Sequence, residues 1–318
     1  MSKDTKQPIS IKQIKSNKKD PILVEYFGYH EKYVQKYGPN TLIIMEVGKF
    51  YEIYTDPINN KGPDIYKISE ITDLTVSRKN KALELSETNV LMCGTPNQAI
   101  TKYLKILIDN GYTVVLINQT KSSNTVTRTV EGIYSPSTFI DNTSIENKYL
   151  MTLYFESNLA LNSSKSNISV GMCAIDSSTG KIYWYETHGS GLMNEEESWE
   201  EAQRFYHFFR PVELIVYNIS NLTNLTKDKE IKINLDEKID LLPNQIILTY
   251  NKINPDYTKL SYQNKLLKKI YPNCGMESPI EFLDLNKNPY AIIAMINSFD
   301  YIFQHNENLI KEMQIPQY

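Results

Sequence analysis

The residues best suited to ligand binding lie in the stretch Met45-Glu-Val-Gly-Lys-Phe-Tyr-Glu-Ile-Tyr54. Alternate side chains of a β-strand share a face, so we expect Phe50, Glu52 and Tyr54 together on one face. The residues between them then point into a core. A stacking ring beside a hydrogen-bonding carboxylate is suited to binding a ligand. The alternative is a half-buried strand on which Phe50 is simply exposed.

A second group of residues could carry out metal-dependent catalysis. Met172-Cys-Ala-Ile-Asp176, a turn and Lys181-Ile-Tyr-Trp-Tyr185 resemble the opening hairpin of an RNase H-like fold. Nucleases of that fold hold Mg²⁺ with a strand aspartate, on which further carboxylates converge. Glu200 and Glu201 could supply these from the next helix. The alternative is structural, because Asp176 at a strand end favours a turn and acidic residues are common on solvated helices.

Sequence motifs of other chemistries are missing. The chain contains no G-x-x-x-x-G-K-[ST], no G-x-S-x-G and no H-E-x-x-H. Its four histidines are scattered, without the spacing of metal ligands. On the binding interpretation we therefore predict no catalytic residue, no metal and no cofactor in this chain.

The composition is typical of a folded intracellular protein. The 318 residues suggest about two domains, and 41% of them are hydrophobic and 22% charged. No apolar run reaches the ~20 residues of a membrane span, and the N-terminus has no secretory signal. Three cysteines, far apart, fit a reducing compartment. The net charge is −3, and the basic excess lies in residues 1–20, so composition alone does not predict a nucleic-acid partner.

The remaining patterns predict alternating helices and strands, which indicates an α/β fold. Asp20-Pro21 begins a helix that Gly38-Pro39 ends, and a β-hairpin follows around Gly48. Further helices are expected at 64–71, 96–110, 195–209 and 289–313. Further strands are expected at 74–77, 89–93, 112–118, 126–134, 149–155, 168–175, 181–186 and 213–217. Nothing later in the chain would cover the apolar face of the last helix, so we expect it to begin a further helical domain.

The order of these segments resembles the MutS family of DNA mismatch repair proteins. The similar segments are the 20–54 region with Gly48-Lys-Phe-Tyr-Glu52, Leu74-Thr-Val-Ser-Arg-Lys79, Cys93-Gly-Thr-Pro96, Gly111 to Gln119, Arg128 to Thr138, and Arg210-Pro-Val-Glu-Leu-Ile215. No single segment is decisive, but the ordered set is specific. Usage rich in Asn, Lys, Ile and Tyr suggests an AT-rich genome, which would suit a viral or organelle-type member.

The resemblance implies a particular domain order. It consists of a flexible basic tail (1–20), a mixed α/β mismatch-recognition domain (21–141), an RNase H-like α/β connector domain (142–275) and the first helix of an all-α core or lever domain (276–318). Two segments depart from the family pattern. Lys49 stands where most bacterial members have Asp, and Ser135-Pro-Ser-Thr138 stands where the family has Thr-Pro-Gly-Thr, so that Ser137 replaces the glycine.

The resemblance also implies roles for individual residues. Phe50 would insert as a wedge at a mispaired base and Glu52 would contact the base edge, with the duplex kinked. Candidate contacts to the DNA backbone are Lys49, Arg78, Lys79, Lys81, Asn97 and Gln98.

The partners implied are double-stranded DNA with mismatches or small loops and a second MutS subunit, with no membrane contact. The family's ATPase domain, with ATP and Mg²⁺, would lie beyond residue 318. Two other functions stay open: a connector module that binds a repair-partner protein without sensing mismatches, and the metal-dependent nuclease.

Overall fold

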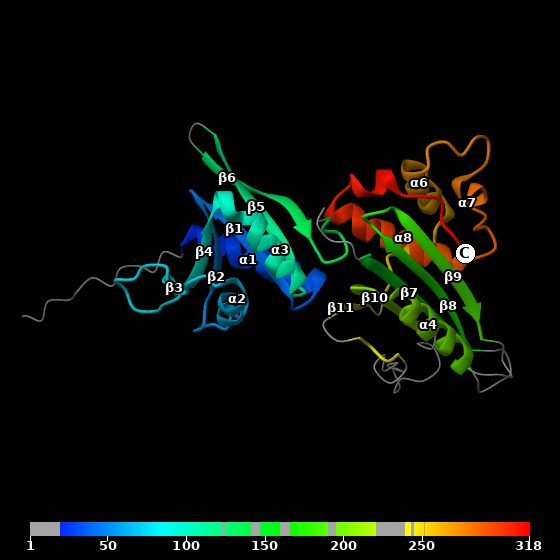
Figure 1. Ribbon diagram of the computed structural model, residues 1–318, viewed down its shortest axis with the longest axis horizontal. Coiled ribbons are helices and arrows are strands. Elements are labelled where there is room, and N and C mark those ends of the chain that lie inside the picture. The colour runs from blue at the N-terminus through cyan, green and yellow to red at the C-terminus, as the bar shows by residue number, and fades with distance from the viewer. Residues whose placement is uncertain are drawn as a thin grey trace, which may run out of the picture.

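The chain forms two β-sheets, each with helices on both faces (Figure 1). The computed structural model describes residues 20–122, 125–140, 147–159, 166–189, 195–220, 239–242, 245–250 and 252–318. Residues 1–19 of the predicted tail and the predicted boundary at 141 and 142 lie outside the described residues. The predicted α/β class is confirmed. Among the described residues, no helix has the length and apolar character needed to cross a bilayer.

The first sheet has six strands in the order β3-β4-β2-β1-β5-β6. Its elements are α1 (Pro21–Tyr37), β1 (Thr41–Val47), β2 (Phe50–Thr55), α2 (Ile65–Thr72), β3 (Ser77–Arg78), β4 (Leu91–Pro96), η1 (Asn97–Ala99), α3 (Ile100–Asp109), β5 (Thr113–Ser122) and β6 (Thr125–Tyr134). The cap prediction for α1 is confirmed, because the Asp20 carboxylate accepts the Ile22 N–H at 2.9 Å. Gly38, with φ 85°, ends this helix.

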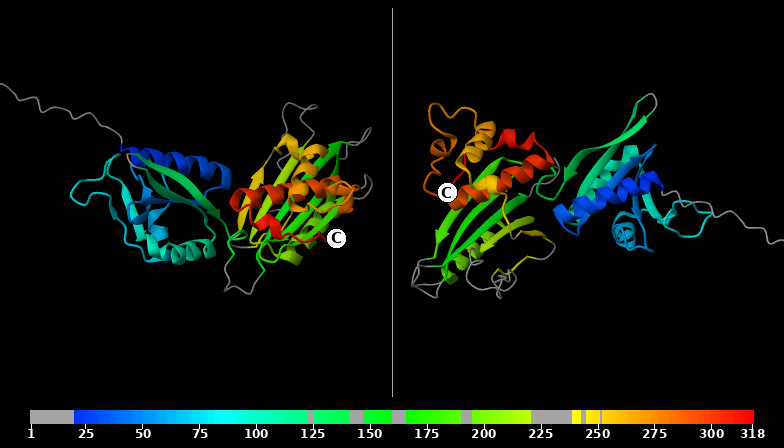
Figure 2. Two further views of the ribbon diagram at one scale, coloured as in Figure 1. Left: turned by 90° about the horizontal axis from the view of Figure 1, so that it is seen from above. Right: turned by 180° about the vertical axis from the view of Figure 1, so that it is seen from behind.

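Helices cover both faces of this sheet. Figure 2 shows α1 on one face and α3 on the other. Tyr26 of α1 packs with Tyr54 of β2 in one core cluster, and Tyr51 and Ile53 belong to the opposite cluster with α2 and α3. The predicted alternation along β2 is therefore confirmed, although Tyr54 is buried.

The second sheet has five strands in the order β11-β10-β7-β8-β9. Its elements are β7 (Tyr149–Leu159), β8 (Ser166–Asp176), β9 (Lys181–His188), α4 (Glu195–Phe209), β10 (Glu213–Ser220), β11 (Ile246–Tyr250), η3 (Pro255–Thr258), α6 (Leu260–Ile270), α7 (Pro279–Phe282), α8 (Pro289–His305) and η4 (Leu309–Glu312). Trp199 and Tyr206 of α4 pack on one face, and α8 packs on the other.

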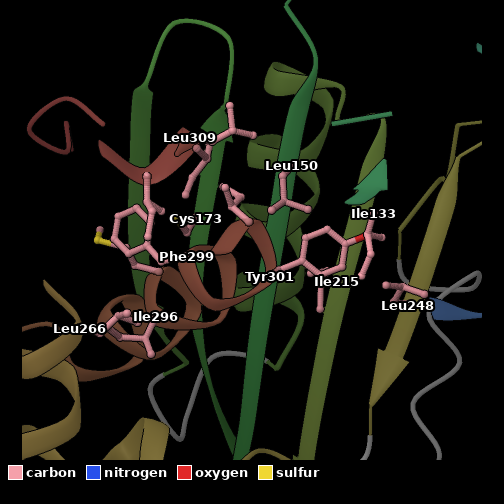
Figure 3. Close-up of a cluster of buried hydrophobic side chains, with 14 of the residues drawn as sticks. Ile133, Leu150, Cys173, Ile215, Leu248, Leu266, Ile296, Phe299, Tyr301 and Leu309 are labelled. Atoms are coloured by element: carbon pink, nitrogen blue, oxygen red, sulfur yellow. The ribbon is translucent and has the colours of Figure 1, made fainter. Parts of the chain in front are cut away.

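The C-terminal helix differs from its prediction. It ends at His305, and its apolar face packs on β7 and β8 beside Leu150 and Cys173 (Figure 3). Gly171 allows this close packing, because a Cβ there would lie 2.0 Å from the Tyr290 carbonyl oxygen. The expectation of an uncovered face was wrong, because the residues that cover it precede the helix. The domain bounds at 142, 275 and 276 stay predictions.

Two strands also differ from the predictions. The strand expected at 74–77 is reduced to Ser77–Arg78, which pairs with Met92 and Leu91 of β4. The sequence did not predict β11, which pairs in parallel with β10. A short strand at the end of a polar segment has no periodicity that distinguishes it from a loop.

A buried carboxylate connects the two sheets. Glu213 of β10 accepts hydrogen bonds from the Ser135 hydroxyl at 2.8 Å, the Ser137 N–H at 3.0 Å and the Tyr301 hydroxyl at 3.0 Å. The Ser137 hydroxyl donates to it as well. Burial raises the pKa of Glu213, and these donors oppose that rise. The segment after β6 is thereby bound to β10 and α8.

The turn at Ser135–Thr138 forms without the family's glycine. Ser137 does not adopt a positive φ, so no glycine is required there. Its hydroxyl instead supplies Glu213 with a donor that glycine lacks.

Replacing Glu213 should separate its roles as acceptor and as charge. Glu213→Ala leaves several buried donors without a partner and is expected to lower the free energy of unfolding by about 3 kcal/mol or more. Glu213→Gln keeps an acceptor and removes the buried charge, so it should match or exceed the wild type at pH 7. Urea denaturation of both variants measures this. Equal losses in the two variants would contradict the assigned hydrogen bonds.

Candidate nucleic-acid interface

Phe50 lies at the tip of the β1–β2 hairpin. Val47 pairs with Phe50 across the hairpin, and Gly48 between them has φ 68°, a conformation that favours glycine. The Phe50 side chain is 48% exposed. The fold therefore holds an apolar ring in solvent at the end of a paired strand.

Exposure falls steadily along this face of β2. Phe50 is exposed, Glu52 is half-buried and Tyr54 is fully buried beneath α1. Tyr26 of α1 meets Tyr54 edge to face, with ring centroids 5.1 Å apart. The face predicted from alternation is thus covered by the helix at one end and open at the other.

Glu52 sits where this face changes from buried to open. Its Oε2 accepts a hydrogen bond from the Tyr54 hydroxyl. Burial raises the pKa of Glu52, while the Tyr54 hydrogen bond and the charges of Lys79 and Arg128 lower it. The net upward shift makes this carboxyl easier to protonate than an ordinary glutamate.

A network of side chains fixes the base of the hairpin. The Glu46 carboxylate accepts the Gln119 N–H at 2.8 Å and the Asn97 side-chain amide at 2.7 Å. The Asn97 N–H donates to the Lys49 carbonyl oxygen at 3.1 Å, and the Tyr51 hydroxyl donates to Asn118 at 2.6 Å. These contacts hold β1, β2, β5 and the segment after β4 together behind Phe50.

Arg128 extends the network to α1. Its Nη1 lies 3.0 Å from Glu25 Oε2, and its Nε donates to the Glu46 carbonyl oxygen at 3.4 Å. The Arg128 side chain is 9% exposed. Neither Glu46 nor Arg128 was among the predicted site residues. One signal in the sequence could have indicated this structural network. Glu46 is a charged residue at the hairpin end of an otherwise apolar strand pattern.

The predicted basic residues lie in different surroundings. Lys49 and Lys81 are exposed. Arg78 donates to the Lys81 carbonyl oxygen at 2.9 Å and lies 3.4 Å from the exposed Glu84 carboxylate. These three side chains can reach solvent, and their phosphate contacts stay predictions.

Lys79 is engaged within the protein. Its ammonium forms an ion pair with Asp20, the residue that caps α1, and lies 5.5 Å from the centre of the Tyr54 ring. Its side chain is 22% exposed. The structure therefore places Lys79 in support of Tyr54, and a phosphate contact there would compete with Asp20.

Asn97 and Gln98 lie in η1, a single 3-10 turn before α3. The Asn97 amide is bound to Glu46, whereas Gln98 is exposed. Of this pair, Gln98 is the side chain that can reach a phosphate. Both roles stay predictions.

The acidic residues that a nuclease would need are bound to other groups of the protein. Asp176 Oδ1 accepts the Ser178 N–H at 3.0 Å, and Oδ2 accepts the Thr179 hydroxyl at 2.8 Å. Glu200 and Glu201 both pair with Arg204 on α4. Within the described ranges, no three His, Cys, Asp or Glu side chains are grouped to hold a metal ion. The arrangement around Asp176 is that of a capped turn.

Comparisons with known proteins show similarity to DNA mismatch repair proteins. A family model described as MutS domain I matches residues 13–143. The chain is similar to a DNA mismatch repair protein mutS homologue of Acanthamoeba polyphaga mimivirus, with 29% identity over 95% of this chain and 28% of the relative. It is also similar to a mitochondrial DNA mismatch repair protein mutS homologue of Sarcophyton glaucum, with 23% identity over 93% of this chain and 33% of the relative.

A bacterial relative is similar over a shorter region. The DNA mismatch repair protein MutS of Clostridium beijerinckii is 34% identical over 51% of this chain and 16% of its own length. The chain thus spans a third or less of the length of these three relatives. A viral and a mitochondrial protein are among them, as the composition suggested.

The raised pKa of Glu52 predicts a cost to stability that depends on pH. Burial disfavours the ionised form of Glu52 in the folded protein. As pH rises through the folded-state pKa, Glu52 ionises and the stability that its protonated form contributed is lost. Glu52→Gln, which cannot ionise and can still accept from Tyr54, should equal the wild type below pH 4 and melt higher at pH 7. Thermal denaturation across this range tests the sign. A lower melting temperature for the variant at pH 7 would contradict it.

Proposed function

Because the chain belongs to the MutS family of DNA mismatch repair proteins, we propose that its β1–β2 hairpin senses mispaired bases in duplex DNA. Phe50 acts as the wedge and Glu52 contacts the base edge beside it. The observation that carries this proposal is the exposed Phe50 ring at the end of a rigidly supported strand.

The wedge selects mispaired sites because their base steps are easier to open. Separating a normal base step costs a few kcal/mol, and a mispaired base is already poorly stacked, so its step opens at a lower cost. A stacked aromatic ring returns roughly 1–3 kcal/mol. Insertion is therefore favourable where the duplex is weak, and the duplex bends to accommodate it.

Rigid support behind Phe50 contributes to this selectivity. A flexible tip would lose conformational entropy on insertion, and that loss would reduce the stacking gain. The Glu46 contacts to Gln119 and Asn97 fix the hairpin before DNA arrives. The free energy of stacking is then available for opening the base step.

Glu52 adds discrimination against normal duplex. A carboxylate near phosphates is repelled unless it accepts a base N–H or takes up a proton. A paired base has its donors engaged, whereas a mispaired base can offer one. Because burial already raises the pKa of Glu52, proton uptake on binding requires a smaller further shift.

Contacts to the DNA backbone are proposed for the exposed side chains Lys49, Lys81 and Gln98 and for the half-buried Arg78. Such contacts orient the protein and carry no sequence information. We assign Lys79 and Asn97 lesser roles in DNA binding because both are bound within the protein. Because these contacts neutralise few phosphates, they should support only weak binding of DNA by the chain alone, with a shallow dependence on salt.

The rest of the mismatch repair function is proposed to lie in the longer protein. ATP and Mg²⁺ would bind an ATPase domain outside these 318 residues, and a second MutS subunit would complete a clamp around the duplex. The second sheet, proposed as the connector domain, would offer a surface to a repair partner. No catalytic role is assigned to this chain.

Replacing Phe50 tests the wedge. Phe50→Ala should lower the preference for mismatched over matched duplex by roughly tenfold or more, because the stacking contribution is lost. Fluorescence anisotropy with both duplexes in about 50 mM salt measures the preference. Phe208→Ala is the matched control, because Phe208 is an exposed phenylalanine on α4. An unchanged preference in Phe50→Ala would exclude the wedge.

The pH dependence of binding tests Glu52. DNA phosphates raise the pKa of Glu52 further, so mismatch binding takes up a proton and weakens as pH rises through the bound-state value. Glu52→Gln resembles the protonated form and should bind mismatched duplex with little dependence on pH between 5 and 8. Anisotropy titrations at several pH values measure this. A variant that keeps the wild-type pH dependence would show that another group takes up the proton.

A further inference from the structure

The Tyr54 hydroxyl lies at the buried end of the Glu52 side chain. It donates to Glu52 Oε2, and this is the hydrogen bond that the described residues provide to that carboxylate. Burial and the charge of Glu52 both raise the pKa of Tyr54, so the hydroxyl keeps its proton and acts as the donor. Oε2 is therefore committed to the protein, and Oε1 is the oxygen that can face a ligand.

The Tyr54 ring is itself held from two sides. Tyr26 of α1 meets it edge to face at 5.1 Å, and the Lys79 ammonium lies 5.5 Å from its centre. Lys79 is in turn fixed by Asp20 at the start of α1. Because these core contacts position the ring, they also set where its hydroxyl oxygen lies.

The strand beside Glu52 does not fix its side chain. Gly94 of β4 is its register partner, and a Cβ at that position would lie 3.3 Å from Glu52 Cγ. The glycine therefore offers no side chain that could hold the Glu52 carboxylate in place. Among the described residues, the hydrogen bond that fixes this carboxylate comes from the Tyr54 hydroxyl.

We propose that Tyr54 is a positioning residue for mismatch recognition, whose hydroxyl fixes the Glu52 carboxylate so that one oxygen faces the mispaired base. This proposal rests on the proposed function of Glu52. The ionised carboxylate accepts this hydrogen bond, so the same contact also opposes its protonation. Tyr54 thereby affects both the direction and the proton occupancy of the group that meets the base.

Other charged groups also influence the protonation of Glu52. Lys79 and Arg128 favour its ionised form, and Asp20 neutralises part of the Lys79 charge. The register partners of Glu52 are Gly94 on β4 and Met45 on β1, and neither has a titratable side chain. Removing the Tyr54 hydroxyl leaves these groups in place, so the expected result is a higher pKa for Glu52.

The first experiment examines the 318-residue chain without DNA. The carboxyl carbon of Glu52 is titrated by NMR, with Glu52→Gln used to assign its signal. Tyr54→Phe should raise the midpoint by on the order of 1 pH unit. Tyr51→Phe is the matched control, because it removes a hydrogen-bonded hydroxyl from the same strand without touching Glu52. A midpoint unchanged in Tyr54→Phe, or shifted equally in Tyr51→Phe, would overturn the proposal.

The second experiment measures mismatch preference against pH in the same variants. Tyr54→Phe should move the pH at which preference falls upward, and Tyr51→Phe should not. In a Glu52→Gln background, Tyr54→Phe should change the preference less than twofold, because the two act through one contact. A large additional loss there would overturn the proposal.

The two experiments distinguish a failure of the proposed function from a failure of the positioning role. If no protein, wild type included, prefers mismatched duplex while the NMR midpoint still shifts, the proposed function fails and the contact stands. If the wild type prefers mismatches but the midpoint and pH profile of Tyr54→Phe are unchanged, the positioning role is wrong. Thermal denaturation of Tyr54→Phe establishes that the comparison is made on a folded protein.

Discussion

The contact between Tyr26 of α1 and Tyr54 of β2 is the constraint on which the candidate site depends. It buries one end of a strand face beneath a helix, and the strand then leads the same face out to solvent. A ring and a carboxylate two residues apart therefore meet different surroundings. The ring is free to stack, and the carboxyl is partly desolvated. This partial burial raises the pKa of Glu52, which would behave as an ordinary glutamate on an open surface.

The polar groups behind the hairpin serve a complementary purpose. A strand tip that carries an exposed apolar ring has little apolar burial of its own to hold it in place. Glu46 compensates by accepting hydrogen bonds from two segments that are distant in sequence, and Arg128 fixes it to α1 through Glu25. Buried charged groups are costly unless their partners are complete. Their presence here is consistent with a hairpin that must stay ordered while its tip is solvated.

Polar groups also hold the junction between the two sheets together. Glu213 is buried, and three of its donors come from a short turn in which Ser137 replaces the glycine of the resembling family. Tyr301 of α8 supplies the fourth contact and packs edge to face on Tyr37 of α1. The first sheet is therefore bound to the second sheet through both backbone and side chains.

The sequence by itself determined the periods, the caps and the order of most elements. Asp20 and Pro21 begin α1, Gly48 forms the hairpin turn, and alternation separates Tyr51 and Ile53 from Phe50 and Glu52, because these signals depend on neighbours along the chain. Tertiary structure alone decided which end of that strand face is buried, that Lys79 binds Asp20 rather than facing solvent, and that α8 packs on strands far earlier in the chain. The physical reason is that burial and ion pairing are set by segments brought together from distant positions, and no local pattern records which segments those will be.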